Sequence, residues 1–254
     1  MKSQLKKSFD KAATTYCQNA NIQRIAALKL VRLIEKDYYE NILELGIGVG
    51  LFTDYLIKKV KFKNYTAIDL SLKSLQKAKE RLKRINFVNA DIESLPLTKT
   101  FSFDLMVGSS VLQWLQNPQI SIPRLFNETK SGCEVYFSIF IKGTFAEMEH
   151  IYSLTNFGHT YSLKSENFYK ELFTSIRGFR WQFERKDYTF YYNSVVDFLK
   201  QHKNTGATYS KRYKRVTKQA YVNFCNLYEE IFSSSSGKIP STYSILYVKG
   251  IKNS

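Results

Sequence analysis

Three glycines at alternate positions, Gly46, Gly48 and Gly50, have the clearest chemical meaning in this chain of 254 residues. They follow an apolar stretch typical of a buried strand, in which Glu44 is the one charged residue. Glycine has no Cβ, so a turn built from it can adopt positive φ and lets a ligand approach the main chain closely. The pattern predicts a strand, a ligand-binding turn and then a helix.

The spacing of these glycines separates two kinds of ligand. A dinucleotide fingerprint, G-x-G-x-x-G, would place a glycine where Leu51 stands. The observed G-x-G-x-G, with Glu44 two residues before Gly46, resembles the first motif of the class I S-adenosylmethionine-dependent methyltransferases. That resemblance implies a ligand with a sulfonium, an amino acid end and a ribose, so we expect Glu44 and the three glycines to bind S-adenosylmethionine.

Two further acids end the next expected strands. Asp69 ends residues 63–69, about 20 residues beyond the glycines, as one β-α-β step requires. Its carboxylate can accept two charge-assisted hydrogen bonds from ribose hydroxyls. Asp91 closes residues 87–92, and the resemblance implies that it binds the adenine amino group while the backbone of Ile92 contacts the ring. The remaining predicted cofactor contacts are Leu70 and Ser109. The competing interpretation is an ordinary glycine turn with both acids as helix N-caps.

Composition and charge exclude some functions and leave others open. Cys17, Cys133 and Cys225 are far apart and lack metal-ligand spacing, so we expect neither a disulfide framework nor a metal site. With no signal peptide and no segment able to span a bilayer, the sequence predicts a cytoplasmic protein without a membrane partner. The net charge of +16 fits either solvated helix faces or a polyanionic partner, which could be nucleic acid or an acidic protein.

The order of the expected elements predicts the architecture. Alternating strands and helices over residues 41–141 indicate an α/β, doubly wound, mostly parallel sheet that carries the cofactor, with helices before it in residues 1–36. Residues 143–240 are expected to hold substrate-side helices and a sixth strand, and residues 242–252 the closing, seventh strand. The last two strands are about 50 residues apart, too far for a hairpin, which indicates a helical lid. We expect the whole chain to form one domain.

Several local patterns together carry a more specific resemblance. The N-terminal pattern is Phe9–Tyr16 followed by Ile22–Arg24, and later come Leu112–Trp114, Gly143–Phe145 and residues 203–207. From about residue 6 to 250 the chain resembles the malonyl-[acyl-carrier protein] O-methyltransferases of biotin synthesis, which have a Rossmann-like fold. Ile47, Val49 and His202 depart from the family pattern. The resemblance implies methylation of the free carboxylate of a malonyl thioester carried on acyl carrier protein, an acidic partner that suits the +16 charge.

Three residues are candidates for the chemistry. A carboxylate with a pKa near 4 is already ionised at neutral pH, so it needs no general base, only alignment in a dry pocket. We expect Tyr16 to orient the carboxylate through its hydroxyl, Arg24 to anchor it by a bidentate pair, and Trp114 to wall the pocket. For each of them, ordinary packing or solvent exposure is the competing interpretation.

Other functions share the same cofactor motifs. The acceptor could be another small acid, such as aconitate, or a quinone precursor. An RNA substrate is the less favoured alternative, because residues 109–112 lack the Asn/Asp-Pro-Pro-aromatic tetrad of many base methyltransferases. A non-catalytic cofactor-binding scaffold is the alternative from a different class.

Overall fold

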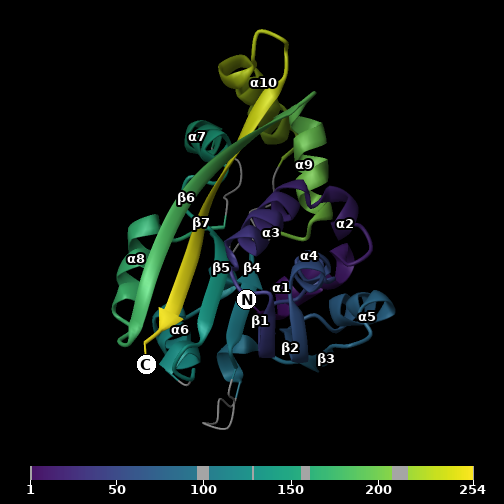
Figure 1. The fold of residues 1–254 in the computed structure, drawn as a ribbon. Coiled ribbons are helices and arrows are strands. Elements are labelled where there is room, and N and C mark those ends of the chain that lie inside the picture. The colour runs from purple at the N-terminus through teal and green to yellow at the C-terminus, as the bar shows by residue number, and fades with distance from the viewer. Residues whose placement is uncertain (1, 96–102, 128, 156–160, 208–216, 254) are drawn as a thin grey trace.

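The computed structural model describes residues 2–95, 103–127, 129–155, 161–207 and 217–253. Figure 1 shows their arrangement. The strands are β1 (Tyr38–Leu45), β2 (Lys61–Asp69), β3 (Asn86–Asn89), β4 (Leu105–Ser109), β5 (Glu134–Phe140), β6 (Phe179–Tyr192) and β7 (Ile239–Lys252). The helices are α1 (Lys2–Ala12), α2 (Tyr16–Asn19), α3 (Asn21–Leu33), α4 (Thr53–Lys59), α5 (Leu72–Arg81), α6 (Pro118–Asn127), α7 (Ala146–Thr155), α8 (Glu166–Thr174), α9 (Val195–Asn204) and α10 (Lys218–Phe232), with short 3₁₀ turns η1 (Ile92–Ser94) and η2 (Leu112–Trp114).

The strands form one sheet in the order β3-β2-β1-β4-β5-β7-β6. The first five are parallel, and β7 is antiparallel to both of its neighbours. This confirms the predicted seven-stranded, mostly parallel sheet. Leu45 at the end of β1 pairs with Ile68 on β2, so the glycine turn and Asp69 leave the sheet side by side. Ligands of such sheets bind at this carboxyl rim.

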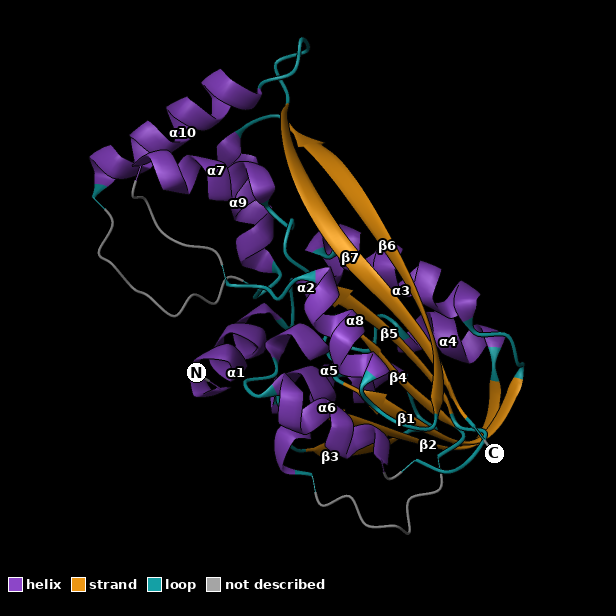
Figure 2. Ribbon diagram, turned by 90° about the vertical axis from the view of Figure 1, so that its left-hand side faces the viewer, coloured by secondary structure: helices purple, strands orange, loops and turns teal. Residues whose placement is uncertain are grey.

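Alternation along the strands directs side chains to the two faces of the sheet. On β4, Leu105 and Val107 join a core covered by α3, α4 and α5, whereas Met106 joins a core covered by α6 and α8. A third cluster, which includes Phe198 and Phe224, lies between α7, α9 and α10. These three helices gather where the long β6–β7 pair extends beyond the parallel strands (Figure 2). The helical segment predicted between the last two strands is therefore present.

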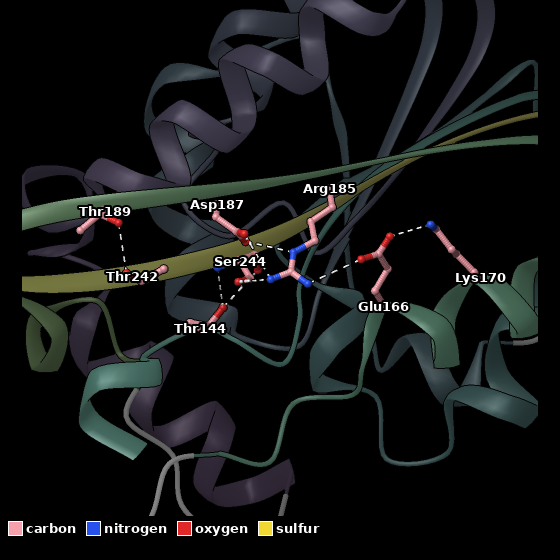
Figure 3. Close-up of polar contacts among 8 residues, drawn as sticks. All are labelled: Thr144, Glu166, Lys170, Arg185, Asp187, Thr189, Thr242 and Ser244. Atoms are coloured by element: carbon pink, nitrogen blue, oxygen red, sulfur yellow. Dashed lines mark hydrogen bonds and ion pairs between the residues drawn. The ribbon is translucent and has the colours of Figure 1, made fainter. Parts of the chain in front are cut away.

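A polar cluster fixes the turn that leads from β5 into α7 (Figure 3). Gly143 has φ +109, and a Cβ there would meet Ser244 Oγ at 2.5 Å. Next to it, Thr144 Oγ1 donates to the carbonyl oxygen of Ser244 at 3.1 Å and accepts from its N–H at 3.0 Å. Arg185 Nη2 donates to Ser244 Oγ at 3.4 Å, and its Nη1 lies 3.7 Å from a carboxylate oxygen of Glu166 on α8. Ser244 on β7 thus binds the turn, and Arg185 connects Ser244 to β6 and α8.

The N-terminal segment is helical, as predicted, but it is divided into three helices. Thr15 lies at the first break, where its hydroxyl donates to the carbonyl oxygens of Ala12 at 3.3 Å and Asn204 at 2.9 Å. A threonine hydroxyl that bonds to backbone carbonyls competes with the helical ladder. The second contact connects this break to the end of α9. Helix α2 begins just after the break, at Tyr16, which lies at the carboxyl rim of the sheet.

Candidate functional site

The three glycines serve different purposes in the turn. Their φ angles are +70, +55 and +85 for Gly46, Gly48 and Gly50, a region that side chains disfavour. A Cβ on Gly46 would meet Val111 Cγ2 at 2.4 Å, and a Cβ on Gly50 would meet Leu82 Cδ1 at 2.7 Å. A Cβ on Gly48 would meet no atom within 4 Å. Gly46 and Gly50 are therefore required for packing, whereas Gly48 leaves open space.

That open space belongs to a cavity of about 140 Å³ at the carboxyl rim of the sheet. Most of the predicted site residues line it, namely Tyr16, Gly46, Gly48, Asp69, Leu70, Asp91, Ile92, Ser109 and Trp114. Helix α1 contributes Phe9, whose ring meets Trp114 edge-on with centroids 5.7 Å apart. The strand ends and the N-terminal helices thus enclose one site.

Asp69 is held in a fixed position at this cavity. Its Oδ2 accepts from the N–H of Gly48 at 2.7 Å, and its Oδ1 accepts from the N–H of Ser71 at 2.7 Å. Burial raises the pKa of Asp69 to about 6, and the nearby charge of Asp10 on α1 adds to the rise. Each carboxylate oxygen keeps a further lone pair, so Asp69 can still accept hydrogen bonds from a ligand's hydroxyls.

Asp91 lines the same cavity but has partners within the chain. Its Oδ1 accepts from the N–H of Glu93 at 2.9 Å, which caps η1, and its Oδ2 is ion-paired with Lys2 Nζ. Lys2 also lies 2.7 Å from a carboxylate oxygen of Glu93. A ligand amino group at Asp91 would share the carboxylate with Lys2 or displace it.

Two of the predicted cofactor contacts, Glu44 and Gly50, lie away from the cavity. Glu44 is 1% exposed, and its Oε2 accepts from Thr53 Oγ1 at 2.8 Å and from the hydroxyl of Tyr65. Strand alternation directs Glu44 toward α4. Neither Glu44 nor Gly50 is among the described residues that line the cavity. Gly50 packs against Leu82, and Glu44 connects β1, β2 and α4, so this geometry gives no support to a direct contact of either residue with the ligand.

Glu44→Gln should stabilise the protein at high pH without affecting ligand affinity. Burial raises the pKa of Glu44 from 4.5 to about 7, so the folded state binds this proton more tightly than the unfolded state does. The stability contributed by this group therefore falls as pH rises from about 4.5 to 7. A glutamine oxygen can accept the same two bonds without a charge. Relative to wild type, we expect a gain of about 3 kcal/mol at about pH 8 and almost none near pH 4.

Denaturant unfolding of wild type and variant across this pH range would measure the difference. Titration with S-adenosylhomocysteine would test the position of Glu44, because a large loss of affinity in Glu44→Gln would contradict its placement away from the cavity.

Arg24 is directed away from the cavity. Its Nη2 donates to the carbonyl oxygen of Cys17 at 2.7 Å and its Nη1 to the hydroxyl of Tyr55 at 3.2 Å. Arg24 is not among the described residues that line this cavity or the larger cavity that adjoins it. This geometry does not support Arg24 as a direct anchor for an acceptor carboxylate. Its bonds hold α2 and α4 against α3 instead.

A second cavity, of about 440 Å³, adjoins the first beneath α7 and α9. Gln23 and Trp114 line both cavities, so they mark the place where the two meet. The wall of the second cavity is largely aromatic and aliphatic, and its lining includes Phe140, Phe145, Met148, Tyr152, Leu163, Phe190, Tyr192, Leu199 and Tyr243. The arrangement provides an acid-bearing chamber connected to a larger one with a mostly apolar wall.

Tyr16 and His202, one at each cavity, are poor bases near neutral pH. Burial raises the pKa of Tyr16 far above its usual value, so its hydroxyl remains a hydrogen-bond donor. Burial lowers the pKa of His202, which lines the second cavity, to about 4. The site is therefore suited to hold an acceptor that is already ionised.

Two glutamines lie at positions whose importance the sequence did not indicate. Gln23 Oε1 and Gln113 Oε1 are buried and have no hydrogen-bond partner among the described residues, and both residues line the second cavity. The motifs Ile22–Arg24 and Leu112–Trp114 favour Arg24 and Trp114, not the glutamine that each motif contains. Nothing in a single sequence distinguishes a glutamine that faces a cavity from one that faces solvent.

No group of three or more His, Cys, Asp or Glu residues in the described part of the chain is placed to hold a metal ion. Nor does any helix in that part have the length and apolar character needed to cross a membrane.

Comparison with known proteins connects this geometry to a family. Residues 43–137 match the model of a methyltransferase domain. The chain is 30% identical over 253 residues to a malonyl-[acyl-carrier protein] O-methyltransferase of Calditerrivibrio nitroreducens, covering 98% of this chain and 96% of that protein. It is 29% identical to the protein of the same name from a Paenibacillus species, covering 97% and 98% of the two chains.

Solved structures share the fold at low identity. A putative methyltransferase of Bacillus halodurans superposes with a TM-score of 0.63 at 14% identity, over 90% of this chain and 99% of that one. The plantazolicin methyltransferase BpumL, solved with SAH, gives a TM-score of 0.52 at 13% identity, over 99% and 90% of the two chains.

Proposed function

We propose a reaction for this chain on one premise: it belongs to the malonyl-[acyl-carrier protein] O-methyltransferase family. It is a methyltransferase that uses S-adenosylmethionine. The proposed reaction is methylation of the free carboxylate of malonyl-[acyl-carrier protein], which gives a methyl ester early in biotin synthesis. The observation that carries this proposal is the pair of adjoining cavities, which meet at Gln23 and Trp114.

The first cavity suits the methyl donor. Gly48 leaves room for close approach to the main chain, Asp69 offers lone pairs to ribose hydroxyls, and Asp91 with Ile92 would take the adenine. When bound there, the donor supplies an electrophilic methyl group on a sulfonium. The acidic side chains of this cavity complement the positive charge of the donor, which supports this assignment.

The second cavity suits an acyl thioester. Its apolar wall would exclude water from the acceptor carboxylate, and Tyr16, which lines the first cavity, can donate a hydrogen bond to it. A carboxylate is ionised at neutral pH, so methyl transfer to it needs no general base. The contribution of the chain is to align the acceptor oxygen with the methyl carbon.

The charge of the protein supports an acidic carrier. The net charge is +16, and exposed Lys200 and Lys203 lie on α9, with Lys203 at the second cavity. Residues 208–216, which continue this basic cluster, lie outside the described residues. An acidic carrier protein would be attracted to such a surface over a distance that shortens as salt is added.

An assay with labelled S-adenosylmethionine tests the proposal. The acceptors are malonyl-loaded acyl carrier protein, the malonyl thioester of N-acetylcysteamine, aconitate and bulk RNA. We expect the carrier-bound substrate to be preferred, with kcat/KM falling about tenfold between about 50 and 300 mM salt, while the small thioester changes little. Transfer only to aconitate or only to RNA would refute the proposed substrate, and no transfer despite cofactor binding would favour a scaffold.

A further inference from the structure

Gln113 carries an unusual buried atom beside the second cavity. It belongs to η2, is 6% exposed and lines that cavity. Its Nε2 donates to the carbonyl oxygen of Ser110 at 2.9 Å, whereas its Oε1 is buried and has no partner in the part of the chain that the structure describes. A buried acceptor without a partner is destabilising, and most such atoms in proteins are satisfied.

The orientation of this amide is fixed by its surroundings. Ser110 adopts φ +60, which is rare outside glycine, and its N–H donates to the carbonyl oxygen of Ser138 at 2.8 Å. The carbonyl oxygen of Ser110 accepts from Gln113 Nε2. If the Gln113 amide were flipped, its Oε1 would instead face that carbonyl oxygen, and two acceptors would repel each other. Oε1 is therefore the atom left for a ligand, and only a ligand with a hydrogen-bond donor can satisfy it.

The possible methyl-accepting substrates differ in whether they carry a hydrogen-bond donor. A malonyl carboxylate and a thioester carbonyl carry only acceptor atoms, and ionised aconitate has no N–H. The arm that carries an acyl group on a carrier protein has an amide N–H two carbons from the thioester sulfur. Gln113 is next to Trp114, where the two cavities meet, so an N–H close to the reacting end is the donor that fits.

We propose that Gln113 Oε1 accepts a hydrogen bond from the first amide N–H of the acyl-carrying arm and thereby selects an amide-linked thioester over a free acid. This assignment rests on the proposed function, which it deepens by naming the group that is recognised. Gln113 is a positioning residue, since it holds the arm and takes no part in methyl transfer itself.

A pair of small substrates tests the contact directly. One is the malonyl thioester of N-acetylcysteamine, and the other is the malonyl thioester of 5-mercaptopentan-2-one, in which a CH₂ group replaces the N–H. We expect wild-type kcat/KM to be about tenfold higher for the N–H substrate. In Gln113→Met the two substrates should react about equally, at the level of the poorer one.

Controls separate recognition from structure. Met148→Leu changes another residue of the same cavity and should keep the tenfold preference. A Gln113→Met protein that loses activity equally toward both substrates would show a purely structural role and overturn the assignment. If that variant does not fold, the wild-type comparison still decides, because equal turnover of both substrates also overturns it. Failure of wild type to methylate either thioester or the loaded carrier would instead overturn the proposed function itself.

Discussion

Gly48→Ala is expected to lower the affinity for S-adenosylhomocysteine about 100-fold, equivalent to ~2.7 kcal/mol. Gly48 has φ +55 and lines the first cavity, and no atom lies within 4 Å of the position of an added Cβ. The methyl group would therefore occupy space that the ligand needs. It would also strain the turn, since a residue with a Cβ at positive φ costs roughly 1–2 kcal/mol.

Gly132→Ala provides the matched control. Gly132 has φ +74 and the same open surroundings, but it lies in the turn before β5 and is not among the described residues that line the cavity. Both variants should lose similar stability in denaturant unfolding, and calorimetric titration should show a binding defect only in Gly48→Ala. Equal affinities in the two variants would show that the ligand does not approach Gly48.

The sheet could be predicted because each parallel strand carries its own local signal. The alternation predicted over residues 41–141 contains β2 to β5 and most of β1. The closing strand was predicted from residue 242, but it begins at Ile239. Its extra residues are fixed by pairing, since Ile239 lies opposite Tyr192 on β6. A partner so distant in the sequence leaves no local pattern.

The site was predictable only where a strand end fixes the direction of a residue. Asp69 and Asp91 follow parallel strands, so topology alone brings them to one rim. Direction around a helix is less certain, because neighbouring residues point about 100° apart. Gln23 therefore reaches the cavities while Arg24, the next residue, bonds to Cys17 and Tyr55. Pattern placed the motif correctly, and tertiary packing decided which of its residues faces the ligand.

Ligand affinity should also depend on the ionisation of Asp69. Its pKa in the free protein is raised to about 6, first by burial and then by the charge of Asp10. Ribose hydroxyls would donate to the ionised carboxylate, so binding must remove a proton below that pH. We expect affinity for S-adenosylhomocysteine to be constant above about pH 7 and about tenfold weaker at pH 5. Asp69→Asn should abolish this step and lower the plateau affinity about 50-fold.

Asp10→Asn distinguishes this explanation from a general effect of acid. Asp10 Oδ1 accepts from Ser71 Oγ at 2.6 Å, and an asparagine oxygen can keep that bond while removing the charge. The midpoint of the affinity step should then move to lower pH, because the charge that raises the pKa of Asp69 is gone, while the plateau stays the same. Glu44→Gln should leave the step in place, since Glu44 lies away from the cavity. Calorimetric titrations of the four proteins from about pH 5 to 8 would measure these midpoints. A step that survives in Asp69→Asn would assign the titrating group elsewhere and remove Asp69 from the binding of the donor's ribose.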